Sequence, residues 1–169
     1  MKDLNHTAFG LLLLMLVAGC AAPRPGVVTG TRPDFPPEAL ITQRATLTAR
    51  GRQFTLNGYV ACSERGGLRL IVTENFGNVL ADLLVRPDGA TTVLRSSSLL
   101  RPQWINNYMA SDLKCVFGAA PDHGCALVVL DANHMLITRR WYRLDLRTVE
   151  VKPGPQPAAL FETAAPARP

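Results

Sequence analysis

The side chains that could do chemistry in this chain are four cysteines and a small number of histidines and serines. Beyond position 20 the cysteines are Cys62, Cys115 and Cys125, so one disulfide and one spare thiol are expected in an oxidising compartment. Spacing leaves two pairings open, Cys115 with Cys125 or Cys62 with Cys125. In the first, Cys62 would be a buried thiol on the inward face of a strand, and buried thiols are usually inert.

The remaining polar residues form no recognisable catalytic pattern. His123 and His134 fall in expected turns, and the serines at 96–98 form a connector without the sequence pattern of a nucleophile elbow. Asp122, His123 and a serine lack the spacing of a catalytic triad, and Asp122, His123 and Cys125 lack a fourth partner for zinc. No phosphate-binding loop of the Walker type is present. We therefore expect no enzyme, no metal and no cofactor.

Cys20 differs from the other cysteines because it ends an uncharged segment near the start of the chain. Lys2 and Asp3 precede a leucine-rich core at residues 9–17, and small residues stand directly before Cys20, which is the layout of a secretory signal peptide. The apolar run covers about a dozen residues, fewer than the roughly 20 that cross a bilayer. Cleavage before Cys20 is therefore expected rather than a membrane span.

The residues Val17, Ala18, Gly19 and Cys20 resemble the lipobox of bacterial lipoproteins, in which an aliphatic and two small residues precede the cysteine. An ordinary signal peptide that contains a cysteine by chance is the alternative. The resemblance implies that Cys20 carries acyl chains such as palmitate, and two or more chains anchor a protein stably. Ala21 after the cysteine implies, by enterobacterial sorting rules, the outer membrane with the protein on its periplasmic side.

The chain of 169 residues divides into four expected segments. Residues 1–19 are the lipoprotein signal peptide, residues 20–35 a lipidated flexible tether, and residues 36–152 one folded domain. Residues 153–169 are expected to form a disordered tail rich in proline and alanine. The reason is that proline removes the backbone donor that strand ladders and helix interiors need.

The net charge of +5 comes mostly from arginines that are scattered over expected strand ends and turns. Nucleic-acid binding would favour basic residues clustered with aromatic ones, so it is not expected. Residues 139–143 alone are dense in arginine and aromatic side chains. Two interpretations of this segment stay open: contact with lipid headgroups through snorkelling, or an edge strand protected by its charge.

Residues 42–95 alternate between apolar and polar positions and are interrupted by glycine-containing turns, which predicts antiparallel strands, the first at residues 45–49. The strand at residues 79–85 is apolar on both faces, with Leu80 and Leu84 opposite Leu83. An ordinary antiparallel sheet has one wet face. The sheet is therefore expected to be buried, or curved with its concave side covered by a helix or an apolar ligand.

Residues 102–117 change to a helical period, with one apolar stripe, Pro102 in the first turn and Gly118 as the stop. The stripe consists of Ile105, Tyr108, Met109, Leu113, Val116 and Phe117. Core packing is the commonest role of such a stripe. Two or three further strands are expected between residues 126 and 151.

Residues 68–80, followed by Asp88 and Gly89, resemble LolB and its relatives, which include LolB-like lipoproteins of unknown function. The shared features are an apolar strand, a loop with an aliphatic or aromatic residue before glycine, a second strand and an Asp-Gly turn. Residues 108–113 resemble the helical segment of those relatives. The resemblance covers about residues 43–151.

The resemblance implies an α+β fold, an incomplete antiparallel β-barrel of the LolA/LolB type covered by a helix. It also implies an apolar cavity for acyl chains, no covalent chemistry, and an exposed apolar residue on a loop between strands that contacts the membrane. Phe76 is the nearest candidate for that residue. The cavity candidates are Phe54, Leu56, Leu70, Leu83, Met109 and Phe117.

Two functions remain open. A periplasm-facing carrier that binds or transfers acylated or hydrophobic lipid molecules predicts an open cavity between these side chains. An accessory or structural lipoprotein that binds another envelope protein predicts that the side chains fill one another's space. We favour the carrier, with the membrane (through Cys20) and a lipid as its partners.

Overall fold

The computed structural model describes residues 27–118 and 124–162. Nine strands form one sheet in the order β1-β7-β8-β9-β2-β3-β4-β5-β6. Every neighbouring pair is antiparallel except β1 (Val27–Thr29), which runs parallel to β7 (Ala126–Asp131). The sheet stays open between β1 and β6, so the fold is α+β with an incomplete, mixed sheet, whereas a wholly antiparallel one was expected.

The remaining strands follow one another mostly through tight hairpins. They are β2 (Ala39–Ala49), β3 (Arg52–Ser63), β4 (Gly67–Glu74), β5 (Val79–Val85), β6 (Thr91–Ser96), β8 (His134–Thr138) and β9 (Tyr142–Pro153). The β2–β3 turn has positive φ at both central residues, Arg50 (50°) and Gly51 (75°). A two-residue turn of this kind matches the twist of the flanking strands.

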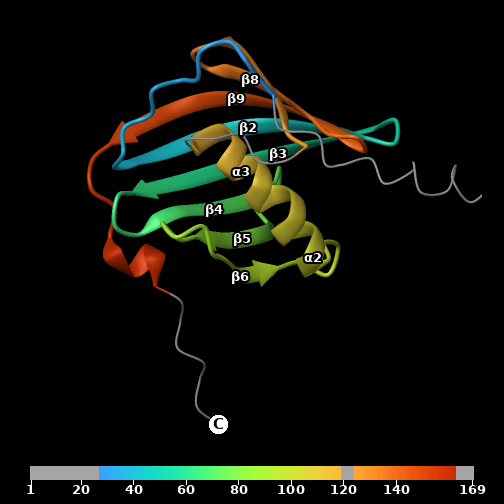
Figure 1. Cartoon of the computed structure of the whole chain (residues 1–169). Coiled ribbons are helices and arrows are strands. Elements are labelled where there is room, and N and C mark those ends of the chain that lie inside the picture. Colours follow the sequence, from blue (N-terminus) through green and yellow to red (C-terminus); the bar gives the residue numbers. More distant parts are fainter. Residues whose placement is uncertain (1–26, 119–123, 163–169) are drawn as a thin grey trace, which may run out of the picture.

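One interrupted helix crosses the concave face of the sheet, in front of β3, β4 and β5 in Figure 1. It comprises α2 (Pro102–Trp104), a π-helical turn η1 (Ile105–Met109) and α3 (Ala110–Phe117). Pro102 stands in the first turn, where its missing N–H costs no hydrogen bond. The predicted range 102–117 is thus confirmed. Ile105, Ala110, Leu113 and Val116 are buried against the sheet.

Two details of the strand prediction are wrong. The pairing of β4 with β5 shifts between Val72 and Thr73, so Leu80 is an extra residue in the ladder and reaches the concave side, although Leu84 does not join it there. A bulge of this kind re-aims one side chain, which simple alternation does not anticipate. The first strand after the tether also starts at Ala39 instead of residue 45, because it pairs with β3 and β9 along its whole length.

The charged segment at 139–143 does not lie in an edge strand. Tyr142 begins β9, which is paired on both sides with β8 and β2. Residues 139–141 form the turn before it, where Arg139 is nearly buried while Trp141 is 61 % exposed. The edge-strand interpretation is therefore wrong, because both sides of β9 are occupied.

The predicted tether and tail are both shorter than expected, as far as the described residues extend. Residues 27–29 add β1 to the sheet, and Phe35 stacks on Phe117 with ring centroids 5.0 Å apart. At the other end a 3-10 helix, η2 (Ala158–Phe161), packs beside β4, and Arg69 Nη1 donates a hydrogen bond to the Leu160 carbonyl at 2.8 Å. The prolines in this segment do not prevent η2 from forming, because η2 is held by contacts with β4.

The disulfide joins Cys115 of α3 to Cys125, directly before β7. It ties the end of the helix to the strand that pairs with β1. Among the described residues Cys62 remains a thiol and is buried. Burial, with the nearby charge of Glu38, raises the pKa of the Cys62 thiol to about 11. The thiol therefore stays protonated at neutral pH and is a poor nucleophile.

A thiol count tests whether the protein holds one disulfide and one buried thiol. In a chain of residues 20–169 with Cys20→Ser, Ellman's reagent at pH 8 should find no reactive thiol in the native protein. It should find one after unfolding without reductant and three after reduction. Three thiols without reductant, or rapid reaction of the native protein, would show that the cysteines are arranged differently.

Candidate ligand cavity

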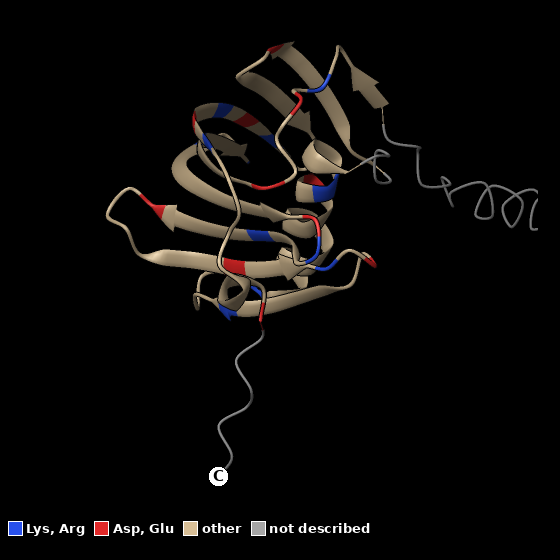
Figure 2. Cartoon of the chain, turned by 90° about the vertical axis from the view of Figure 1, so that its left-hand side faces the viewer, with Lys and Arg blue, Asp and Glu red and all other residues tan. Residues whose placement is uncertain are grey.

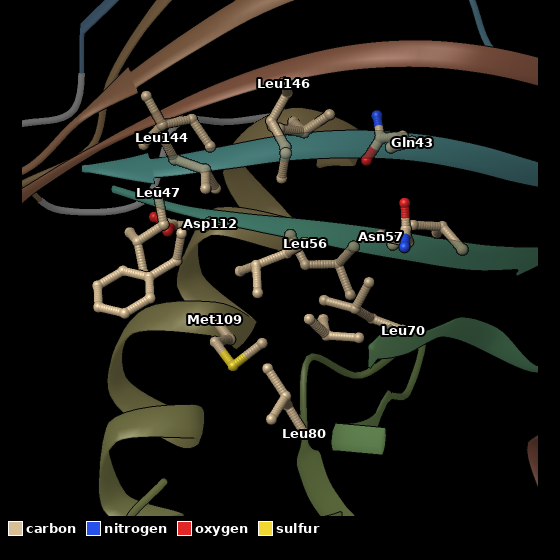
Figure 3. Close-up of a pocket in the computed structure, with 18 of the residues that line it drawn as sticks. Gln43, Leu47, Leu56, Asn57, Leu70, Leu80, Met109, Asp112, Leu144 and Leu146 are labelled. Carbon is tan, nitrogen blue, oxygen red and sulfur yellow. The ribbon is translucent and has the colours of Figure 1, made fainter. Parts of the chain in front are cut away.

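An apolar cavity of about 400 Å³ lies between the helix and the concave face of the sheet. This volume lies in the range of small-molecule and cofactor sites. Most of its wall is aliphatic, as Figure 3 shows, with contributions from β2, β3, β4, β5, β9 and the helix. The aliphatic residues labelled there are Leu47, Leu56, Leu70, Leu80, Met109, Leu144 and Leu146.

Small residues in the floor keep the cavity open. Gly58 of β3 pairs with Gln43 of β2, and Ala45 pairs with Leu56. A Cβ built at Gly58 would meet Leu70 Cδ1 at 3.8 Å and Gln43 Cβ at 3.9 Å, so the glycine leaves a gap that a side chain could enter.

Of the six predicted cavity residues, Phe54, Leu56, Leu70, Met109 and Phe117 line the cavity. Leu83 does not line it. Its side chain is fully buried in the core cluster that includes Ile105 and Leu113, so it supports the helix instead. Some apolar side chains of β5 belong to the core and others line the cavity. The alternation of the sequence does not show which residue does which.

The cavity reaches the surface at the end of the sheet where β2 turns into β3. Figure 1 shows this turn on the right. Phe54 and Leu99 both line the cavity and are 47 % and 79 % exposed, so the wall continues into the surface there. An aromatic group stands beside this opening. It consists of Trp104, Tyr108 and Tyr142, with ring centroids 5.7 to 6.0 Å apart.

A buried charged pair borders the cavity below the opening. Asp112 of α3 lines the cavity, and its Oδ1 accepts a hydrogen bond from Arg139 Nε at 2.9 Å. The same oxygen lies 2.8 Å from Arg139 Nη2 in an ion pair. Its Oδ2 accepts a hydrogen bond from the Tyr142 hydroxyl. Burial, followed by the negative charge of Asp112, raises the pKa of Tyr142 far above its usual value. Tyr142 is therefore a permanent donor, and the group locks the helix to the turn before β9.

Besides Asn57 of β3, the cavity wall holds a further polar residue that sequence reasoning missed, which is Gln43. It lies on the concave face of β2, is 5 % exposed, and lines the cavity. Extending the alternation of β2 back to residue 39 would have shown a glutamine among Ile41, Ala45 and Leu47. For Asp112 no such signal exists, because its partner Arg139 is 27 positions away in the chain.

Phe76 lies in the β4–β5 turn, as predicted, and is 91 % exposed. Of the residues weighed for catalysis, His134 contacts Asp145 at 3.0 Å on the sheet. His123 and Asp122 lie outside the described residues, as does Cys20. Within residues 27–118 and 124–162 no three side chains of His, Cys, Asp or Glu are grouped to hold a metal ion.

Comparison with known proteins adds no relatives, since the chain matches no protein-family model and no curated protein. Among the described residues, no helix has the length and apolar character needed to cross a membrane. Evidence on function therefore comes from the cavity and the residues around it.

The Asp112 group gives a stability prediction. Asp112→Asn removes the charge that compensates nearly buried Arg139, so we expect the free energy of unfolding to fall by about 3 kcal/mol or more. Urea denaturation of the same Cys20→Ser chain measures this. Glu150→Gln, which breaks an exposed pair with Lys152, is the matched control and should change stability by under about 0.5 kcal/mol. Equal effects of the two changes would contradict the proposed lock.

Proposed function

We propose that this protein binds acylated or similarly hydrophobic lipid molecules in the cavity between its helix and sheet. The observation that carries the proposal is an apolar cavity of about 400 Å³ that reaches the surface through exposed apolar side chains. An empty apolar space forfeits packing contacts, so a fold that keeps one is expected to fill it with a ligand. The resemblance of the sequence to LolB and its relatives supports the same function.

The opening is well suited to face a membrane. Phe76, Leu99 and Trp141 are 91 %, 79 % and 61 % exposed, and each lies in a turn or loop at this end of the sheet. Clusters of exposed apolar side chains mark surfaces that bind other molecules or membranes. Exposed arginines accompany them at the same end, namely Arg50, Arg52, Arg101, Arg140 and Arg143.

The two ends of the molecule differ in charge. At the opening, Arg140 stacks 4.8 Å from the Trp141 ring, which pairs a cation with an apolar side chain as membrane-interface segments do. Seen from the opposite end, in Figure 2, acidic and basic positions are interspersed. The end with the opening is therefore the better match for an anionic lipid surface, to which each basic residue adds about 1 kcal/mol.

The place where β1 begins agrees with this orientation. By strand register, Val27 of β1 lies level with Ala126, Thr138 and Arg143, at the end that carries the opening. Cys20 is seven residues earlier, which at full extension spans about 25 Å. A lipid on Cys20 would hold the opening near the bilayer. Our proposal is therefore a non-enzymatic lipoprotein at the periplasmic side of the outer membrane that binds or transfers lipid.

A pair of tryptophan variants tests the cavity. Leu56→Trp enlarges a side chain in the cavity wall, whereas Thr55→Trp places the same ring on the opposite, exposed face of β3. With the apolar fluorophore N-phenyl-1-naphthylamine, we expect Leu56→Trp to weaken binding at least tenfold and Thr55→Trp to leave it unchanged. Circular dichroism confirms that both fold. Equal binding by all three proteins would place the probe outside the cavity.

Charged substitutions test the membrane-facing end. Phe76→Glu combined with Trp141→Glu should reduce co-sedimentation of the Cys20→Ser chain with phosphatidylglycerol vesicles several-fold, because it replaces apolar contacts by repulsion. Leu130→Glu combined with Val149→Glu is the matched control, since the two residues are 51 % and 64 % exposed and Leu130 lies at the β7–β8 turn. If this control reduces binding as much as the test variant, the opening does not face the membrane.

A further inference from the structure

The cavity wall contains a buried amide group that has no partner in the fold. Gln43 is 5 % exposed, and its Nε2 makes no hydrogen bond with any group of the described residues. Its neighbours on the same face of β2 are Ile41 and Ala45, and Gly58 stands opposite it on β3. Figure 3 shows the amide at the edge of the apolar lining.

A second unpartnered polar atom lies on the adjacent strand. The β2–β9 ladder shifts between Thr42 and Gln43, which leaves Val149 unpaired and sets Gln43 opposite Thr148. Thr148 continues the alternation of Leu144 and Leu146 and lies beside the cavity without lining it; its buried Oγ1 also has no hydrogen-bond partner among the described residues. Bulges commonly re-aim side chains next to binding sites. Here the bulge pairs two unsatisfied polar side chains.

Without a ligand, the unpartnered Gln43 Nε2 and Thr148 Oγ1 lower the stability of the folded protein. An unsatisfied buried donor or acceptor costs about 1 to 3 kcal/mol, and nearly all buried polar groups in native proteins have a partner. Leucine or methionine would fit the apolar surroundings of position 43 without this cost. A glutamine at this position is explained if a bound molecule supplies the missing acceptor.

The depth of Gln43 in the cavity and the charges around it indicate what kind of acceptor the ligand carries. Gln43 lies four residues along β2 from Leu47, which is near the opening, so the polar position is deep in the cavity. Its neighbour Arg44 is exposed, on the opposite face of the strand, and so is Arg147, the register partner of Arg44. A buried carboxylate would need a cation close by. A neutral oxygen needs one donor, and a hydroxyl can bond both to Gln43 Nε2 and to Thr148 Oγ1.

We infer that Gln43, with Thr148, binds a neutral oxygen, a hydroxyl or carbonyl, on an otherwise apolar chain, and so selects oxygen-bearing neutral lipids over hydrocarbons and fatty-acid anions. This inference rests on the proposed lipid-binding function and specifies its ligand class. Gln43 is then a specificity-determining residue, since the cavity itself depends on other side chains.

Displacement of N-phenyl-1-naphthylamine from the chain of residues 20–169 with Cys20→Ser tests the inference. The competitors are 1-dodecanol, 1-chlorododecane and dodecanoate at pH 8, which share chain length. The wild-type sequence should bind the alcohol about three- to tenfold more tightly than the chloride, as one hydrogen bond predicts, and more tightly than the anion. Gln43→Leu should lose the preference and bind the chloride more tightly than the alcohol, because the hydroxyl then loses its hydrogen bonds to water without a replacement.

The controls distinguish a failure of ligand recognition by Gln43 from a failure of lipid binding itself. Gln43→Met serves if Gln43→Leu does not fold, and Gln53→Leu makes the same change at an exposed position of β3 and should keep the preference. Gln43→Leu should also melt at a higher temperature than the ligand-free wild type, because it removes the unsatisfied amide. If both proteins bind the fluorophore but Gln43→Leu keeps the preference for the alcohol, Gln43 does not recognise the ligand. If neither binds the fluorophore, the lipid-binding function itself fails.

Discussion

The structure depends on one geometric constraint, which is that a single short helix has to cover the concave face of a nine-stranded sheet. Residues 102–117 extend about 24 Å as a helix, and their apolar stripe buries β3, β4 and β5. Toward β2 and β9 the C-terminal end of α3 packs on the sheet, where Val116 joins a cluster with Ala45 and Leu146. Because Gly58, opposite Gln43, has no side chain and Ala45, opposite Leu56, has a small one, the space beside this contact stays unfilled, and the cavity is the result.

Because the helix is small, its position must be fixed from several sides. The disulfide holds Cys115 at the C-terminal end of α3 to Cys125, and the Asp112–Arg139–Tyr142 group holds the middle of α3 to the start of β9. Both attachments are on the α3 half. The other half, α2 and η1, lies beside the opening and carries Trp104 and Tyr108, and a π-helical turn separates the halves. π-helical turns are frequent at functional sites, and this one ends at Met109 in the cavity wall.

Sequence reasoning succeeded where one local pattern decides the structure and failed where tertiary contacts decide it. The helix at 102–117 was predictable because its apolar residues recur at helical spacing without interruption. The placement of Leu56, Leu70 and Met109 at the cavity was predictable because each lies on the apolar face of its strand or helix. Leu80 was misplaced because a bulge in the β4–β5 pairing is invisible in one strand's alternation. The ordered residues after Pro153 were missed because Arg69, far away in sequence, binds the Leu160 carbonyl.

The central claim is that the cavity holds a lipid in the working protein. Native mass spectrometry of the Cys20→Ser chain, directed to a bacterial periplasm and purified without detergent, tests it most directly, with organic extraction to recover the bound molecules. The account predicts a population with added mass that extraction removes and that proves to be a hydrophobic molecule with a long chain. A single ligand-free mass, together with no uptake of long-chain alcohols or esters offered to the protein, would contradict it.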